Sequence, residues 1–191
     1  MAATVYSAVP QSSSRLFRFM LLALHAIGGL LGGAVIGTLL ALIGRALPLP
    51  SAVLVAVLLA VAFLEFRRAN LGIYQPQRGV PLSWMNWPGA AYMGGYGFVL
   101  GAGLFTPYGS SSLIALAATA LVSGDVVLGG TILGLYGLTR AIAQIVTGIA
   151  ASSVGLACAA GRAQTAKAML RRPMAALAVI AAFAVTVSGH L

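Results

Sequence analysis

Polar side chains that could bind a solute interrupt this apolar chain at two places. The first lies in the apolar run 126–150, where Tyr136, Arg140, Gln144 and Thr147 recur at helical spacing and so share one helix face. A guanidinium with an amide beside it can hold an anion or a polar solute. An arginine that snorkels or pairs structurally with other helices would produce the same pattern, so both interpretations stay open.

The second place is the segment 106–112, where a proline, a glycine and several hydroxyl groups stand inside an apolar stretch. Proline removes a backbone donor and clashes with the preceding helical turn. Broken backbone is tolerated in a membrane only where protein or water satisfies it, so this segment should face the protein interior at the depth of Arg140. The predicted binding residues are Thr106, Pro107, Tyr108, Ser110, Ser111, Tyr136, Arg140 and Gln144.

Groups that could support other chemistry are few. Cys158 is the only cysteine, so no intrachain disulfide can form. The two histidines, His25 and His190, and the two acidic residues, Glu65 and Asp125, do not cluster at the spacing of metal ligands. The sequence contains no nucleophile–base pair and no phosphate-binding loop. We therefore predict no catalytic activity, no metal and no cofactor.

Two of these residues have simple structural interpretations. Asp125 follows Gly124 at the start of run 126–150, which is the position of a helix N-cap. His25 lies within an apolar run, where we expect its ring to form a hydrogen bond to another helix. A proton-linked role for His25 is the alternative.

The composition places the chain in lipid. Of its 191 residues 60% are hydrophobic and 7% are charged, whereas an ordinary soluble domain is about a quarter charged. The net charge of +9 comes from short basic patches beside apolar runs, which is the pattern of topology signals and of contacts with anionic lipid. Nucleic-acid binding is therefore not expected.

Four apolar runs are predicted to cross the membrane as helices. They are 16–44, 51–66, 126–150 and 173–189. Residues 1–14 are polar and are predicted to form a tail, and residues 15–191 are predicted to form a single transmembrane helical domain. Run 16–44 is too long for the core of a signal peptide, so we interpret it as a retained anchor.

The region 84–122 allows either one broken crossing or two short ones. With one crossing and a cytoplasmic N-terminus, nine basic residues face the cytoplasm and only Arg45 lies outside. With two crossings the count is five against five. The positive-inside rule therefore favours five crossings, with six as the alternative. The predicted fold is an all-α polytopic membrane helix bundle with one broken helix, in a bacterial-type inner membrane.

Small residues and aromatic rings indicate how the helices pack. The glycine pairs at small-xxx-small spacing include Gly28 and Gly32, Gly97 and Gly101, and Gly130 and Gly134. Such faces let helices approach closely, within the chain or against a partner. The aromatic residues that fit a belt at the cytoplasmic membrane interface are Trp84, Trp87, Tyr92 and Tyr96.

Residues 89–150 resemble part of the CcdA proteins and of the membrane domain of DsbD, which carry reducing equivalents across the inner membrane. Those proteins have a segment of the type G-x-G-x-T-P-C-x-G-P-x-L. With one residue added before the threonine, the corresponding residues here are Gly101, Gly103, Thr106, Pro107, Gly109 and Leu113. The resemblance implies a proline-kinked helix that faces a central cavity and is followed by two more helices.

The relay chemistry of those proteins is not expected here. They use a cysteine beside the kink proline, whereas this chain has Tyr108 there and its single cysteine at position 158. Thiol–disulfide exchange needs a thiolate and a second sulfur, and Tyr108 supplies neither. The resemblance therefore carries over a scaffold, without the redox function.

Two functions are consistent with these features. The first is a carrier or channel for a small polar or anionic solute, with the broken helix as its site. The alternative is a non-catalytic membrane subunit or anchor that packs by its glycine faces against a larger complex. The expected partners are the lipid bilayer, including anionic lipid at the basic cytoplasmic loops, and either further copies of the chain or other membrane subunits.

Overall fold

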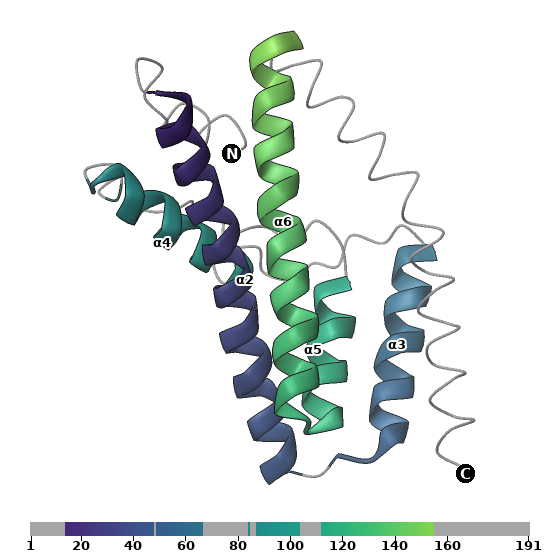
Figure 1. Cartoon of the computed structure of the whole chain (residues 1–191). Helices are drawn as coiled ribbons and strands as arrows, with labels where there is room; N and C mark the ends of the chain where they lie inside the picture. The colour runs from purple at the N-terminus through teal and green to yellow at the C-terminus, as the bar shows by residue number, and fades with distance from the viewer. Residues whose placement is uncertain (1–13, 48, 67–83, 85–86, 104–111, 155–191) are drawn as a thin grey trace. The chain divides into compact units, whose positions relative to one another are not determined.

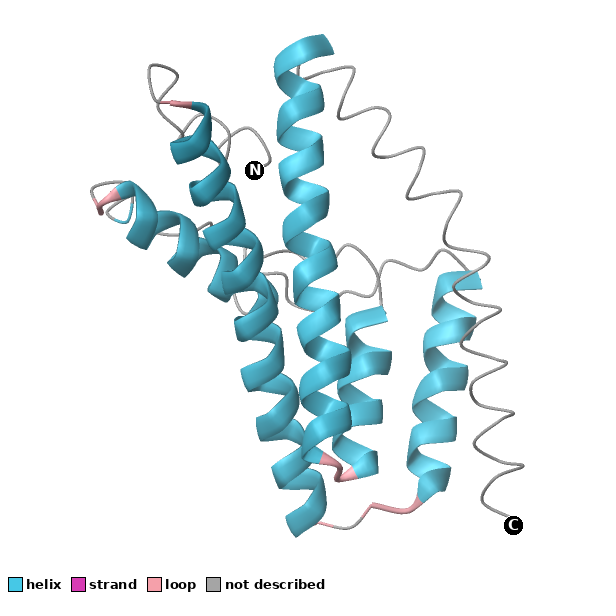
Figure 2. Cartoon of the chain, viewed as in Figure 1, coloured by secondary structure: helices cyan, strands magenta, loops and turns pink. Residues whose placement is uncertain are grey.

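The computed structural model describes residues 14–47, 49–66, 84, 87–103 and 112–154. Within these ranges the chain forms five α-helices and no strand (Figure 1, Figure 2). They are α2 (Arg15–Ala46), α3 (Ser51–Phe66), α4 (Gly89–Ala102), α5 (Ser112–Ser123) and α6 (Val126–Val154). The predicted all-α fold class is confirmed for this part of the chain.

Three helices coincide with predicted apolar runs. Helices α2, α3 and α6 begin within one residue of the runs 16–44, 51–66 and 126–150. Each run lacks an internal proline, so nothing interrupts the backbone hydrogen bonds along it. The predicted run 173–189 and the predicted tail, apart from Ser14, lie outside the described residues.

The sequence predicts a broken helix in the region 84–122, and the structure has two separate helices there, α4 and α5. Helix α4 ends earlier than the position of Pro107 indicates. Gly103 adopts a left-handed conformation with a φ of 73°, and its N–H donates to the Leu100 carbonyl at 3.2 Å. A residue at positive φ ends a helix, and glycine adopts this conformation without a Cβ clash. The next helix, α5, begins at Ser112. Five crossings, with six as the alternative, stay a prediction.

Within the described part of the chain, two helical segments are long and apolar enough to cross a membrane: Arg15–Ala46, and Val126–Thr147 within α6. At 1.5 Å per residue, these 32 and 22 residues extend about 48 and 33 Å, against a hydrocarbon core about 30 Å thick. The described parts of α3, α4 and α5 have 16, 14 and 12 residues, fewer than the roughly 20 that a crossing needs. Among the described residues, length and composition therefore support a membrane location for two helices.

The chain divides into two compact units, and α2 and α6 each contribute to both. Unit 1 comprises residues 1–35, 76–107 and 134–164, and unit 2 comprises residues 36–75, 108–133 and 165–191. Unit 1 therefore contains the first part of α2, all of α4 and the second part of α6. Unit 2 contains the end of α2, α3, α5 and the start of α6.

Apolar contacts between helices hold unit 2 together. Helices α3 and α5 lie side by side (Figure 1). The side chains that form their contact are Leu54, Leu58, Ala115, Ala118 and Val122. The end of α2 also approaches the start of α6 closely, because a Cβ atom on Gly37 would overlap the backbone of Gly129. Small residues thus bring two helix backbones together in this unit, as the glycine spacing predicts.

The turn between α5 and α6 ends in the predicted N-cap. Asp125 Oδ1 accepts hydrogen bonds from the backbone N–H groups of Val127 at 2.8 Å and Leu128 at 3.1 Å. These bonds satisfy two of the donors that the start of a helix leaves without an intrahelical acceptor. Gly124, directly before the cap, has a φ of 60°, a conformation that favours glycine.

Replacing Asp125 by alanine is expected to lower the free energy of unfolding by about 1 kcal/mol, because both N–H groups lose their acceptor. Reversible unfolding of the detergent-solubilised protein in a denaturant series measures the difference. Asp125→Asn keeps an oxygen acceptor at the same position and should stay within a few tenths of a kcal/mol. An equal loss in both variants would show that the charge, and not the hydrogen bonding, stabilises the start of α6.

Candidate functional site

Three helices of unit 1 meet at Gly29 of α2, Gly101 of α4 and Gly137 of α6, which we call the glycine crossing. A Cβ atom on Gly29 would lie 2.7 Å from the Gly137 carbonyl oxygen, and one on Gly101 or Gly137 would overlap the backbone of Gly29. Gly28 and Gly32 approach the α4 backbone equally closely. Because the backbones touch here, side chains that flank the crossing on different helices are brought within reach of one another.

Two of the predicted belt aromatics are buried inside unit 1. Tyr92 and Tyr96 are buried against Leu21 and Met93, and their rings stack with centroids 5.9 Å apart. They are four residues apart on α4, so they share the face that packs against α2. Their place relative to a membrane interface stays a prediction. Trp84 stacks on the exposed Trp87, with centroids 4.6 Å apart.

His25 of α2 is completely buried, with 0% of its surface exposed. Its Nδ1 lies 3.3 Å from the backbone carbonyl oxygen of Met93 on α4. The imidazole ring also stacks on the ring of Tyr96, with centroids 5.5 Å apart and planes inclined by 17°. The predicted hydrogen bond to another helix is confirmed. The second ring nitrogen, Nε2, has no hydrogen-bond partner among the described residues.

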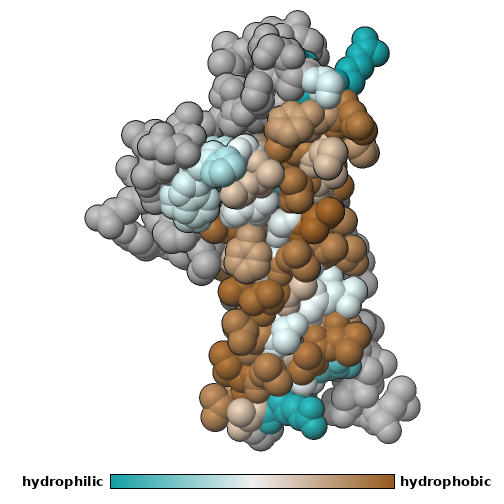
Figure 3. Space-filling model, turned by 60° about the vertical axis from the view of Figure 1, so that its left-hand side comes forward, coloured by the Kyte–Doolittle hydropathy of each residue, from teal (hydrophilic) through white to brown (hydrophobic). Residues whose placement is uncertain are grey.

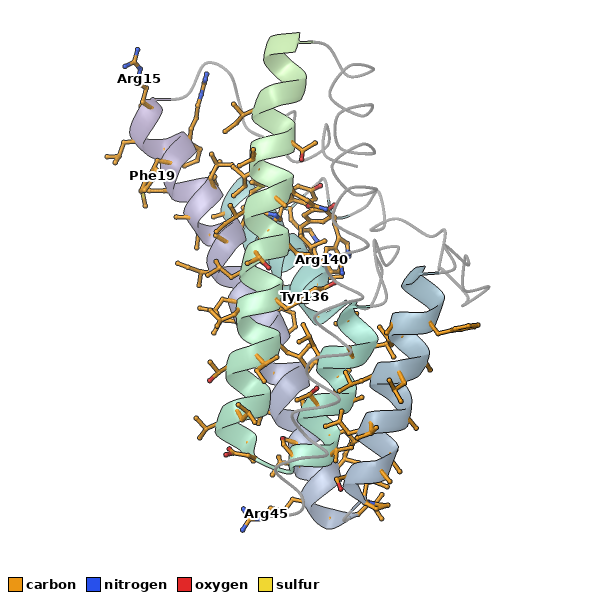
Figure 4. The ribbon with its side chains drawn as sticks, turned by 90° about the vertical axis from the view of Figure 1, so that its right-hand side faces the viewer. Arg15, Phe19, Arg45, Tyr136 and Arg140 are labelled. Atoms are coloured by element: carbon orange, nitrogen blue, oxygen red, sulfur yellow. The ribbon has the colours of Figure 1, made fainter. Side chains whose placement is uncertain are left out.

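The four polar residues predicted to share a face of α6 all lie half-buried along it. The guanidinium carbon of Arg140 lies 5.9 Å from the centroid of the Tyr136 ring, within the range of a cation–π interaction, and Figure 4 shows the two side chains close together. One turn further on, Gln144 hydrogen-bonds the side chain of Tyr96 on α4. The Thr147 hydroxyl instead donates to the Ala143 carbonyl of its own helix at 2.6 Å.

These contacts form one polar cluster that draws on all three helices of unit 1. We define it as His25, Tyr96, Tyr136, Arg140 and Gln144. Tyr96 connects its members, since it stacks on His25, hydrogen-bonds Gln144 and interacts electrostatically with Arg140. The cluster offers guanidinium, amide and phenol groups as hydrogen-bond donors, a set suited to a carboxylate, a phosphate or another small anion.

The structure places only part of the predicted binding site. Tyr136, Arg140 and Gln144 come together as predicted, whereas the predicted site residues between 106 and 111 lie outside the described residues. Their proximity to Arg140 stays a prediction. Sequence reasoning did not assign Tyr96 and His25 to the site. The available signal was that His25 is the one histidine inside an apolar run, and that Tyr96 lies a single helical turn from Tyr92.

Comparison with known proteins assigns no family to the chain. No protein-family model matches it, and no curated protein or solved structure is significantly similar to it. The resemblance of residues 89–150 to the CcdA and DsbD proteins therefore stays an expectation from the residues alone. The function has to be argued from the polar cluster and from the surfaces around it.

Proposed function

We propose that this chain is an integral protein of a bacterial-type inner membrane that carries a small anionic solute through the polar cluster of unit 1. Support for the membrane location comes from an apolar stripe that follows the whole of α2. Its members are Leu16, Met20, Leu24, Ile27, Leu31, Val35, Leu39 and Leu42, all exposed and spaced three or four residues apart. Their spacing keeps them on one face of the helix over about 39 Å, longer than a hydrocarbon core.

The charged residues at the two ends of α2 also support a membrane location. Arg15 and Arg45 stand at opposite ends of the helix, with the apolar stripe between them (Figure 4). Figure 3 shows exposed apolar side chains covering much of this face. In the most apolar stretches of α2 and α6, only 33% and 28% of the residues are buried, whereas the core helix of a soluble protein is mostly buried. An exposed apolar surface of this extent is stable where lipid covers it.

The observation that carries the proposed function is the polar cluster at the glycine crossing. Arg140 lies 14 residues from the start of α6, about 21 Å along a helix that would cross the core in about 30 Å. A charged residue at such depth costs about 2.5–3.5 kcal/mol on insertion scales, and such residues commonly mark solute or ion pathways. We infer that the chain keeps Arg140 at this depth despite the cost, because its guanidinium binds a solute.

The distribution of charged residues in the chain indicates the sign of the solute's charge. Both acidic residues of the chain, Glu65 and Asp125, belong to unit 2. Unit 1 is therefore net positive, and a positive interior of low dielectric constant attracts an anion. The planar guanidinium of Arg140 can bind two oxygens of a carboxylate or phosphate at once, and Gln144 and Tyr96 can add neutral donors.

Replacing Arg140 by glutamine is expected to weaken anion binding at least roughly tenfold, because a charge-assisted hydrogen bond contributes about 1.5–3 kcal/mol. Thermal shifts of the purified protein with acetate, phosphate and methanesulfonate measure binding, and uptake into proteoliposomes measures transport. Thr139→Ala is the matched control, since Thr139 is the exposed neighbour whose hydroxyl donates to its own helix at Tyr136. If no anion stabilises the unmodified protein, or if both variants bind equally well, the carrier proposal is wrong.

The second candidate function, a non-catalytic membrane subunit, has an observation of its own. On α6, the exposed side chains of Leu128, Leu135, Ile142 and Ile149 recur every seven residues. A seven-residue apolar repeat is the pattern of a seam between two helices, so another copy or another membrane subunit would fit there. The mass of the complex extracted in mild detergent separates the two functions, because a homo-oligomer favours the carrier and a stable hetero-complex favours the subunit.

A further inference from the structure

The hydrogen bond at His25 determines which ring nitrogen carries hydrogen. The Met93 carbonyl oxygen can only accept a hydrogen bond, so Nδ1, which lies 3.3 Å from it, must be the N–H donor. In the neutral ring, Nε2 is then a bare acceptor with a free lone pair. This atom is buried and has no hydrogen-bond partner among the described residues. The fold thus holds a proton acceptor ready inside unit 1.

We propose that His25 binds a proton at Nε2 and that this proton is coupled to the anion bound at Arg140. The proposal rests on the proposed carrier function and specifies its coupling ion. The proton comes from water on one side of the membrane, occupies the Nε2 lone pair, and leaves from the same atom after transport. Imidazole is suited to this role because its unperturbed pKa lies near pH 6.5, within the physiological range.

Tyr96 provides the physical connection between the proton site and the anion site. Its ring stacks on His25, and its side chain hydrogen-bonds Gln144, one turn from Arg140. A protonated imidazole is a cation against the face of this ring, which is a favourable arrangement. Gln144 Oε1 is a buried acceptor without a hydrogen-bond partner among the described residues, so the cluster also contains an acceptor for a new N–H donor.

The groups around His25 set the sign of the coupling. The titratable and charged side chains of the described helices in unit 1 are Arg15, Arg18, Tyr92, Tyr96, Tyr136 and Arg140. None of them is a carboxylate, so a proton on His25 adds to a positive field. It therefore strengthens the binding of an anion in the same unit, and by thermodynamic reciprocity a bound anion strengthens the binding of the proton. Proton and monovalent anion would cross together without net charge movement.

The first test observes the proton directly. In the full chain with ¹⁵N-labelled histidine in lipid vesicles, the His25 resonances should show a neutral ring with hydrogen on Nδ1 at about pH 8, and protonation of Nε2 on acidification to about pH 5. His190→Asn removes the only other histidine and assigns the signals to His25. A ring that stays neutral over this range, or that carries its hydrogen on Nε2 at high pH, overturns the proposal.

The second test measures the coupling with methanesulfonate, which stays a monovalent anion throughout this range. Its affinity should rise at least about fivefold between pH 8 and pH 5.5, the lower end of typical coupling between sites. The rise should persist in His190→Asn and fall below about twofold in His25→Asn, which keeps a donor for Met93 but cannot bind a proton. An unchanged pH profile in His25→Asn overturns the coupling.

The two tests separate failure of this inference from failure of the proposed function. A protein that binds the anion while His25 does not titrate retains the carrier function and contradicts only the proton coupling. A protein in which His25 titrates but no probe anion binds contradicts both. Because the first test uses the unmodified ring, it stays decisive even if His25→Asn reduces the amount of folded protein.

Discussion

Replacing Gly101 by alanine is expected to leave little folded protein, whereas the same change at Gly94 of the same helix is expected to be tolerated. A Cβ atom at position 101 would overlap the backbone of Gly29, and backbone cannot move aside as a flexible side chain can. At Gly94 a Cβ atom would meet nothing within 4 Å. Forcing extra atoms into a packed contact costs about 1–3 kcal/mol, and we expect the upper end or more at the glycine crossing.

The two variants can be compared directly, because alanine raises the intrinsic helix propensity by the same amount at both positions. Alanine is about 1 kcal/mol more favourable than glycine inside a helix, so Gly94→Ala should be neutral or slightly stabilising. Size-exclusion chromatography of the solubilised protein and its midpoint of thermal unfolding measure the outcome. Equal stability of Gly94→Ala and Gly101→Ala would show that α4 does not approach α2 at backbone distance.

The long helices could be predicted from the sequence because their signal is strong and local. An unbroken apolar stretch without proline forms a helix wherever it is buried or in lipid, and α2, α3 and α6 begin where such stretches begin. The end of α2 was also marked, since Ala46 stands two residues before Pro48, and the residue before a proline is disfavoured in helices. The N-cap at Asp125 is a local pattern of the same kind.

The end of α4 could not be predicted in the same way. Glycine tolerates both helical and left-handed conformations, and α4 contains Gly94, Gly95, Gly97 and Gly101 within its helical part. Of the described glycines in and directly after α4, only Gly103 takes a positive φ, and it ends the helix. Which glycine does so depends on the contacts that each one makes, and Gly97 and Gly101 are held in the helix where it packs against α2. Pro107 indicated a break but not its first residue.

The candidate site shows the same division between local and tertiary information. Tyr136, Arg140 and Gln144 lie on one chain segment, so the helical period alone places them on one face. Tyr96 of α4 reaches Gln144 on that face, and His25 of α2 contacts Tyr96, because three backbones meet at the glycine crossing. Glycine spacing predicted close approach without naming the partner helix. A tyrosine at a membrane interface and a tyrosine in a helix contact look alike in sequence, so the sequence alone does not distinguish the two for Tyr96.

Replacing Leu31 by aspartate is expected to lower the fraction of the protein in which α2 is inserted in the membrane. Leu31 stands near the middle of α2, is 53% exposed and belongs to the apolar stripe. If the stripe faces lipid, an aspartate there costs about 2.5–3.5 kcal/mol, which is roughly a hundredfold shift in the insertion equilibrium. The fraction that stays with membranes after alkaline extraction measures the effect, with the unmodified protein as the reference.

Leu47→Asp is the matched control for Leu31→Asp, because it makes the same substitution outside the predicted membrane core. Leu47 is 62% exposed, but it lies just past the end of α2, beside Arg45, where a charge can reach water. The same chemical change should therefore leave membrane association nearly unaffected at this position. If the stripe were covered by water, both aspartates would be tolerated, since a charge on a soluble surface typically changes stability by less than about 0.5 kcal/mol. Equal retention of the two variants would contradict a lipid-facing α2, and with it the membrane setting on which the carrier proposal depends.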